Sequence, residues 1–204
     1  MARAIIATVI ACFLLATLAM PGAAEDPENV PVTELHPSHL GIAIEAPGVE
    51  DWLLTEQRDE EWWRITYRTW GDDDSTSVVT FKTDRYPTGG FAREHVNLKQ
   101  LARTVLAASR SPDNIFFKEK SAGLKREVMH GVEACHIRIV VEERNNPRFK
   151  GTALILEKSR LLMLHPRNPD QLISVAVDTR YRLERERESA DELLSDFMEA
   201  MQFQ

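Results

Sequence analysis

The sequence predicts an α+β protein in which one antiparallel β-sheet of about six to eight strands carries a mid-chain helix and a C-terminal helix. Two observations support this fold class. From residue 132 to residue 178, apolar and polar residues alternate in short runs that only turns separate. Such strands are antiparallel neighbours, because a parallel pair needs a crossover of about a dozen residues. The chain also shows only two amphipathic helical stretches, which is typical of strand-rich α+β folds.

Three strands are expected before the first helix. The first lies near residues 40–44 and ends at Pro47, which lacks the N–H that a sheet interior needs. The second covers residues 62–70 and the third covers residues 78–83, with an acidic turn at residues 71–75 between them. Successive strand residues point to opposite faces. The residues of the second strand expected to face the core are Trp63, Ile65 and Tyr67.

Two helices are predicted by apolar residues that recur at helical spacing. The first covers residues 92–109 and stops before Pro112, and its apolar face consists of Leu98, Leu101, Ala102 and Val105. The second begins at Ser189, which forms a capping box with Glu192 three residues later. Its apolar stripe consists of Leu193, Leu194, Phe197 and Met201.

Six strands are expected between the helices, at residues 115–120, 124–130, 135–142, 152–157, 160–165 and 172–178. Lys158-Ser159 is predicted to be the reversal between the fourth and the fifth. The last strand should point Ile173, Val175 and Val177 inward. In the strand at 135–142, Cys135, Ile137, Ile139 and Val141 share one face, and His136, Arg138 and Glu142 share the other.

The amino terminus predicts export. Arg3 is followed by an apolar run to Met20 and by small residues up to Ala24, the pattern of a cleaved signal peptide at residues 1–24. The h-region is somewhat long, so an uncleaved anchor is the alternative, whereas the apolar run past Cys12 argues against a lipoprotein. Residues 25–36 are expected to be a flexible acidic tail and residues 37–204 a single domain. The expected location is periplasmic or secreted, without an integral membrane span after cleavage.

Charge and cysteine content limit the partners. Removal of residues 1–24 takes away Arg3 alone among charged residues, so 25 basic and 32 acidic residues become 24 and 32, a net charge of −8. Nucleic acids and anionic membranes select basic proteins, so neither is an expected partner. The processed chain keeps only Cys135 and cannot form an intramolecular disulfide. Strand parity places Cys135 on an apolar face away from His136, which predicts a buried, unreactive thiol.

The element order resembles the PsbP-like α/β sandwich over roughly residues 38–204. The matching features are an early strand ending at Ala46-Pro47, a mid-chain helix, a Gly131 turn before Ala134, a strand closing near Gly151, and a terminal helix followed by Phe203. Families of that fold are mostly small accessory or binding proteins, so the resemblance implies a non-catalytic role. No functional motif of the family matches, and no residue role is transferred.

Catalytic, cofactor and metal residues are not assigned by the sequence. His36 and His39 with Glu34 lack the second ligand pair of a metal site. The stretch Asp72-Asp73-Asp74 lacks the spacing of a calcium loop, and Gly89-Gly90 lacks the rest of a phosphate-binding loop. The short motifs of serine hydrolases and zinc peptidases are absent from the sequence. A dispersed catalytic triad stays open, because its members need to meet only in space.

One candidate binding surface remains, on the outward face of the strand at residues 62–70. Trp and Arg dominate binding hot spots, because a rigid ring and a planar cation bury large areas at low entropic cost. The face consists of Trp62, Arg64, Thr66, Arg68 and Trp70. The alternative is that a helix covers this face. The functional prediction is a non-catalytic accessory protein of the bacterial envelope that binds another envelope protein; a small-molecule or lipid carrier and a hydrolase are the alternatives.

Overall fold

The computed structural model describes residues 28–29, 35–37, 41–46, 52–58, 60, 62–70, 76–85, 97–110, 116–145, 152–168, 170–182 and 189–204. Its first six strands are β1 (Glu28–Asn29), β2 (Leu35–Pro37), β3 (Ile42–Glu45), β4 (Leu53–Arg58), β5 (Trp62–Trp70) and β6 (Thr76–Arg85). The elements that follow are α2 (Leu98–Ser109), β7 (Phe117–Met129), β8 (Val132–Glu143), β9 (Leu154–Leu164), β10 (Gln171–Arg182), α3 (Ala190–Ala200) and β11 (Gln202–Phe203).

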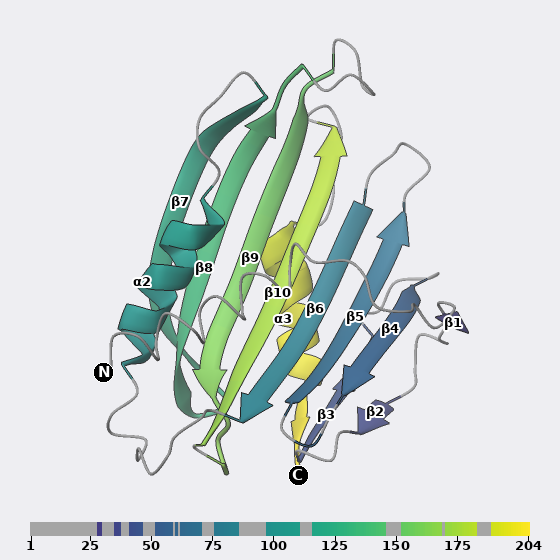
Figure 1. Ribbon diagram of the computed structural model, residues 1–204, viewed down its shortest axis with the longest axis vertical. Coiled ribbons are helices and arrows are strands. Elements are labelled where there is room, and N and C mark those ends of the chain that lie inside the picture. Colours follow the sequence, from purple (N-terminus) through teal and green to yellow (C-terminus); the bar gives the residue numbers. More distant parts are fainter. Residues whose placement is uncertain are drawn as a thin grey trace.

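The main sheet has eight strands in the order β1-β4-β5-β6-β10-β9-β8-β7, and a small sheet has the order β11-β3-β2. All pairings between the described strands are antiparallel. The main sheet therefore joins two meanders, β4–β6 and β7–β10, through the β6–β10 pair (Figure 1). The predicted α+β class with two helices is confirmed.

Two predicted breaks in the strands are wrong. The two strands predicted at residues 115–120 and 124–130 are one strand, β7, which has a bulge between Glu119 and Ser121. Lys158-Ser159 is not a reversal, since β9 runs through it and Ser159 is 1 % exposed. Neither position holds proline, and a buried serine is tolerated in a strand when its hydroxyl is hydrogen-bonded.

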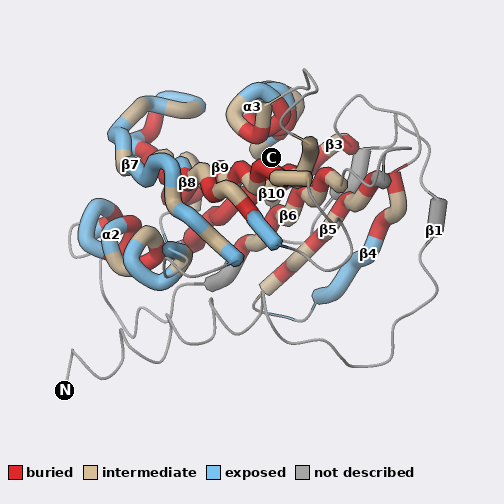
Figure 2. Tube along the Cα trace, turned by 90° about the horizontal axis from the view of Figure 1, so that it is seen from above, coloured by how far each residue is buried: buried red, intermediate tan, exposed pale blue. Residues whose placement is uncertain are grey.

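The helices lie on opposite sides of the main sheet (Figure 2). Helix α2 starts later than predicted, at Leu98, because the Asn97 side chain accepts the hydrogen bond from the Gln100 amide and acts as its N-cap. Its predicted apolar face is buried against the Cys135 side of β8, together with Leu162, Leu164 and Leu172. This cluster forms the smaller of the two cores.

Helix α3 covers the larger core, which contains the aromatic residues. The predicted capping box is present, since Ser189 accepts from the Glu192 amide and the Glu192 carboxylate accepts from the Ser189 amide. Phe197 lies against Phe81 and Tyr67, with ring centroids 6.4 and 6.2 Å apart. All predicted stripe residues of α3 are buried in this core, as are Ile173, Val175 and Val177 of β10.

The hairpin between β7 and β8 uses the predicted Gly131 turn. His130 and Gly131 have φ of 48° and 77°, between the paired residues Met129 and Val132. Two successive positive φ values are typical of a type I′ turn, whose twist matches that of the strands it joins. The turn also holds α3, because the His130 ring Nε2 lies 2.8 Å from the Met198 carbonyl oxygen.

Several predicted segments lie outside the described residues, namely the signal peptide at 1–24, His39, Asp72–Asp74 and Gly89–Gly90. In the predicted tail at 25–36, Glu28–Asn29 pairs with β4 and Leu35–Pro37 with β3, and the flexibility of the tail stays a prediction. Within the described part of the chain, no helix has the length and apolar character to cross a membrane.

Candidate functional site

Strand β5 presents its two sides to different surroundings, as its alternation predicts. Its inward side is in the larger core, where Trp63 is 1 % exposed and Ile65 and Tyr67 are fully buried. The predicted surface residues are partly exposed wherever the structure describes their side chains, at Trp62, Arg64, Thr66 and Arg68. For Trp70 the structure describes the backbone, which pairs with Thr76.

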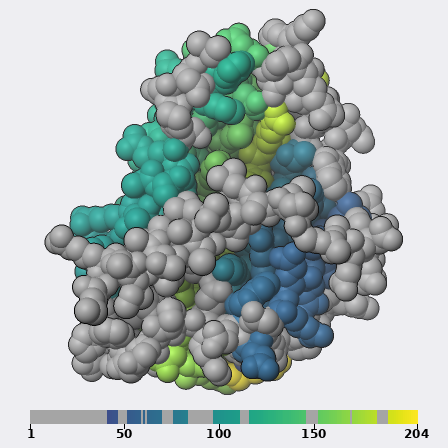
Figure 3. Space-filling model, viewed as in Figure 1, coloured from purple at the N-terminus to yellow at the C-terminus, as the bar shows by residue number. Residues whose placement is uncertain are grey.

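The strand register extends this outward side across β4, β6, β10 and β9, in three neighbouring rows. The first row is Gln57, Arg64, Lys82 and Ser174. The second is Thr55, Thr66, Thr80, Ala176 and Arg160. The third is Arg68, Val78, Asp178 and Lys158. We call these three rows the cationic face, and Figure 3 shows atoms of β4–β6 (blue) at the surface on this side of the sheet.

Cations outnumber carboxylates in the described rows of the cationic face. Its rows contain five cationic side chains and one carboxylate, although the chain as a whole carries a net charge of −7. Arg64 and Lys82 are directly opposite each other on neighbouring strands, a placement of like charges that destabilises a sheet. Arg64 is partly buried, and desolvation lowers the pKa of its guanidinium.

The one carboxylate of the face belongs to Asp178 and is largely withdrawn from solvent. Burial raises the pKa of Asp178, and the nearby positive charges of Arg160 and Lys158 oppose that rise. Burial likewise lowers the pKa of Arg160, against the attraction of Asp178. Asp178 therefore compensates part of the positive charge of Arg160 and Lys158 on β9. It lies at the edge of the face, two strands away from Arg64.

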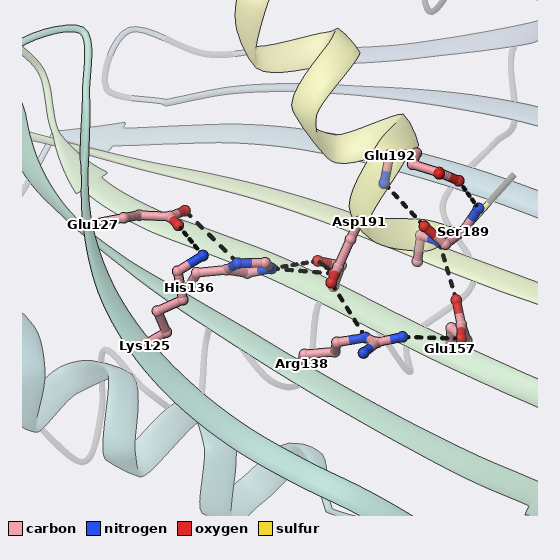
Figure 4. A network of polar contacts seen from close by, with 10 residues as sticks. Lys125, Glu127, His136, Arg138, Glu157, Ser189, Asp191 and Glu192 are labelled. Atoms are coloured by element: carbon pink, nitrogen blue, oxygen red, sulfur yellow. Dashed lines mark hydrogen bonds and ion pairs between the residues drawn. The ribbon is translucent and has the colours of Figure 1, made fainter.

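A second polar cluster lies on the opposite side of the sheet, at the amino terminus of α3 (Figure 4). The Ser159 hydroxyl donates to Asp191 Oδ1 over 2.6 Å, and the His136 Nε2 lies 2.6 Å from the same hydroxyl oxygen and 3.3 Å from Asp191 Oδ1. Arg138 reaches Asp191 at 3.2 Å and Glu157 at 3.3 Å. We call these five residues the α3 network.

The α3 network contains a serine, a histidine and an aspartate, but not in the order of a nucleophilic triad. A serine has a single hydroxyl proton, and Asp191 accepts it. His136 Nε2 must then donate to Ser159, whereas a general base needs an unprotonated nitrogen at that hydroxyl. Ser159 is also only 1 % exposed, so a substrate does not reach it. In this cluster the geometry is that of a structural hydrogen-bond network.

The network fixes the start of α3 on the sheet. Glu157 Oε2 accepts a hydrogen bond from the Ala190 amide at 3.2 Å, one of the amides that the first turn of a helix leaves without a helical partner. Asp191 is also in the first turn, where the helix dipole favours negative charge. On the far side, Glu127 Oε1 lies 3.7 Å from His136 Nδ1, and Lys125 lies 3.1 Å from Glu127.

The sequence did not reveal this network. Its members come from β8, β9 and the more distant α3, and the sequence pattern predicts a turn at Ser159. The one available signal was the polar side of the strand at 135–142, where His136 and Arg138 alternate with buried residues. For Cys135 the structure agrees with strand parity, since the residue is fully buried and burial raises the pKa of its thiol.

Among the described residues, no group of three or more His, Cys, Asp or Glu side chains could hold a metal ion. Comparison with known proteins adds no assignment, since no family model and no curated protein matches this chain. Any functional argument must therefore come from the cationic face and the α3 network themselves.

Proposed function

We propose that this protein is an exported, non-catalytic accessory protein of the bacterial envelope that binds another envelope protein through the cationic face. The observation that supports this proposal is the set of side chains on the outward side of β5, where Trp62, Arg64 and Arg68 are partly exposed at the surface of the sheet.

The residue types on the face agree with this role. Arg64 belongs to the first row of the face, and Trp62 lies two residues before it on the same side of β5; both residue types are common at the energetic centres of interfaces. The side chains stand on a rigid sheet, so little conformational entropy is lost when a partner binds. The signal pattern at residues 1–24 supports export to the periplasm or the medium, and the resemblance to the PsbP-like sandwich agrees with an accessory role.

The proposal is tested by crosslinking the processed protein in its own envelope fraction, purifying the recovered protein, and measuring its affinity for three variants. Arg64→Ala is expected to weaken binding at least about fivefold, since truncation of a central arginine removes both charge and contact area. Trp62→Ala should act in the same direction. Lys118→Ala is the matched control, because Lys118 is an exposed strand cation on the opposite side of the sheet.

Circular dichroism and melting temperature must show that each variant is folded. Equal affinity of the wild-type protein and the folded Arg64→Ala and Trp62→Ala variants for the recovered partner would contradict the proposal. A loss of affinity in the Lys118→Ala control as large as that of Arg64→Ala would also contradict it, because binding would then follow total charge and not this face.

A further inference from the structure

We propose that His165 is an acid-sensitive latch, which holds the small sheet against the main sheet while its ring is neutral and lets the small sheet open when the ring is protonated. The latch involves neither the cationic face nor the α3 network, so it is independent of the proposed function. Each nitrogen of this buried ring has a contact that fits the neutral form.

His165 lies where three separate parts of the chain meet. It directly follows β9, and its backbone amide donates to the Gln171 carbonyl oxygen at the start of β10. Its ring contacts Phe203 of β11, with centroids 5.1 Å apart, and its Nε2 lies 3.3 Å from the carbonyl oxygen of Gly41, directly before β3. Figure 1 shows β3 and β11 at the end of the main sheet where β9 ends and β10 begins. The residue is 2 % exposed, so these contacts are made inside the protein.

The Nδ1 atom of the ring accepts two hydrogen bonds from the turn between β9 and β10. The Arg167 amide lies 3.1 Å from it and the Asn168 amide 2.9 Å. Backbone amides only donate, so Nδ1 carries no proton. A neutral imidazole has one N–H, which must then be on Nε2, where it is donated to the Gly41 carbonyl oxygen. Both nitrogens are satisfied in this tautomer.

Protonation breaks this arrangement at Nδ1, because Nε2 already carries a proton. The new N–H would face two backbone N–H groups, and both amides would lose their acceptor in a buried site. Burial lowers the pKa of His165, the hydrogen bond to Gly41 opposes this change, and the positive charge of Arg167 adds to it. The folded protein therefore favours the neutral ring.

The elements packed around the ring contribute few charges. The turn contributes Arg167 and Asp170, which are both exposed. Strand β11 contributes the uncharged Phe203, which also contacts the His130 ring, with centroids 4.9 Å apart. His130 titrates too, but its Nε2 lies 2.8 Å from the Met198 carbonyl oxygen, so its proton is directed to α3. The two histidines can therefore be separated by substitution.

The same site fixes both described strands that carry the small sheet. The Gly41 carbonyl oxygen also accepts from the Gln204 amide at 2.8 Å, and Phe203 pairs with Ile42. A protonated ring avoids the two amides of the turn only by moving into water, and its contacts with Gly41 and Phe203 are then lost. Ile42 and Ile44 are fully buried in the larger core, so opening of β3 exposes apolar side chains.

The test is hydrogen–deuterium exchange with mass spectrometry at about pH 7.5 and about pH 5, on either side of the ordinary histidine pKa. Rates are normalised to those of an unstructured chain at the same pH. The folded-state pKa is lowered, so the contribution of the latch is full above the unfolded-state pKa and is lost as the pH falls below it. We expect peptides covering β3 and β11 to lose protection at least about fivefold at the lower pH, and peptides covering β8 less than about twofold.

Two variants assign the effect to one ring. His165→Asn offers an amide oxygen to the same two backbone amides but does not titrate, so its loss of protection should be less than about twofold. His130→Gln is the matched control, because its side-chain amide can still donate to the Met198 carbonyl oxygen. It should lose as much protection as the wild-type protein. If His165→Asn does not fold, Arg167→Gln replaces it and should show a smaller loss than wild type, since a charge that lowers the pKa of His165 is removed.

Unchanged protection of β3 and β11 in the wild-type protein would overturn the proposal. Equal losses in β8 would also overturn it, because the acid effect would then be general unfolding. A loss in folded His165→Asn as large as that of wild type would assign the effect to another group, and so would its disappearance in His130→Gln. In place of an unfolded His165→Asn, a loss in Arg167→Gln that equals or exceeds that of wild type would contradict the latch.

Discussion

The main sheet exposes two polar surfaces, on opposite faces and near opposite ends. The α3 network lies on the α3 side of β8 and β9, and the cationic face lies on the other side, centred on β5 and β6. Both arise from strand alternation, which buries one side of β5, β6 and β8, whereas β10 is buried on both sides over most of its length. They differ in charge balance, because His136 and Arg138 meet Asp191 and Glu157 within the chain, whereas the cationic face has one carboxylate, Asp178, at its edge.

This difference separates the structural role of the α3 network from the binding role that we propose for the cationic face. A polar network whose members satisfy each other specifies the position of the elements it joins, here the start of α3 on β8 and β9. The outward side of β5 carries partly exposed Trp and Arg side chains and is the surface that we propose for binding. Substitutions in the first surface should therefore affect stability, and substitutions in the second should affect binding.

The largest expected effect is on the core beneath the cationic face. Phe81 is fully buried on β6 and contacts Trp63 with ring centroids 5.2 Å apart. Phe81→Ala should lower the free energy of unfolding by about 3–5 kcal/mol, because it removes a large side chain and leaves a cavity. Thr80→Ala, one residue earlier on the outward side, should change it by less than about 0.5 kcal/mol. Denaturant titration measures both, and similar losses would mean that β6 is buried on both sides.

A smaller loss is expected from the centre of the α3 network. Ser159→Ala should lower the free energy of unfolding by about 1–3 kcal/mol, because it leaves His136 and Asp191 without their shared hydroxyl partner in a buried site. Ser121→Ala on the exposed part of β7 is the control. Urea denaturation compares the two, and an unchanged midpoint for Ser159→Ala would show that the network does not hold α3.

The cap of α3 contributes about 1 kcal/mol, the usual cost of losing a serine N-cap. Ser189→Ala should lower the free energy of unfolding by this amount, since it removes the acceptor for the Glu192 amide, 3.2 Å away. Ser195→Ala, at an exposed position inside the same helix, should be neutral or slightly stabilising. Thermal melts of both variants measure the difference, and equal shifts would place the start of α3 elsewhere.

The smallest effect concerns the pH dependence of an ion-paired carboxylate on β8. Hydrogen bonds from Arg144 and then Lys120 lower the pKa of Glu142 to about 2. The folded-state pKa of Glu142 lies below its unfolded-state pKa. The stabilisation that the ionised carboxylate gives to the folded protein is therefore fully present above the unfolded-state pKa and is lost as the pH falls towards about 2. Glu142→Gln should reduce the loss of stability between about pH 6 and about pH 3. Denaturant titrations of the wild-type protein and of Glu142→Gln at the two pH values measure the loss of stability, and equal losses in the two proteins would show that the carboxylate contributes nothing.

Much of the fold follows from local pattern. Alternation places Trp63, Ile65 and Tyr67 in the core, helical spacing gives the buried faces of α2 and α3, and the capping box gives the start of α3. The errors have local causes too. Lys158-Ser159 has the composition of a turn, but Asp191 and His136 hydrogen-bond the Ser159 hydroxyl, which allows the serine to be buried within a strand. The bulge in β7 has the sequence pattern of a strand end, but both halves of β7 pair with β8.

The candidate site was predictable only in part. The outward position of Arg64 and Arg68 follows from strand parity. The rows that add Lys82, Arg160 and Asp178 depend on the β6–β10 pairing, which brings together strands from different halves of the chain. Register between distant strands is set by packing of the whole sheet and has no local signal. The α3 network was missed for the same reason.

The comparison between the two polar surfaces is tested most directly by one matched pair of substitutions, Arg138→Gln and Arg64→Gln, with the free energy of unfolding of each measured by denaturant titration. The account predicts that Arg138→Gln lowers it by about 1 kcal/mol, because Asp191 and the buried Glu157 lose a cation. It predicts that Arg64→Gln leaves it unchanged within about 0.5 kcal/mol or raises it, since repulsion from Lys82 is relieved. A loss from Arg64→Gln equal to that from Arg138→Gln would contradict the account.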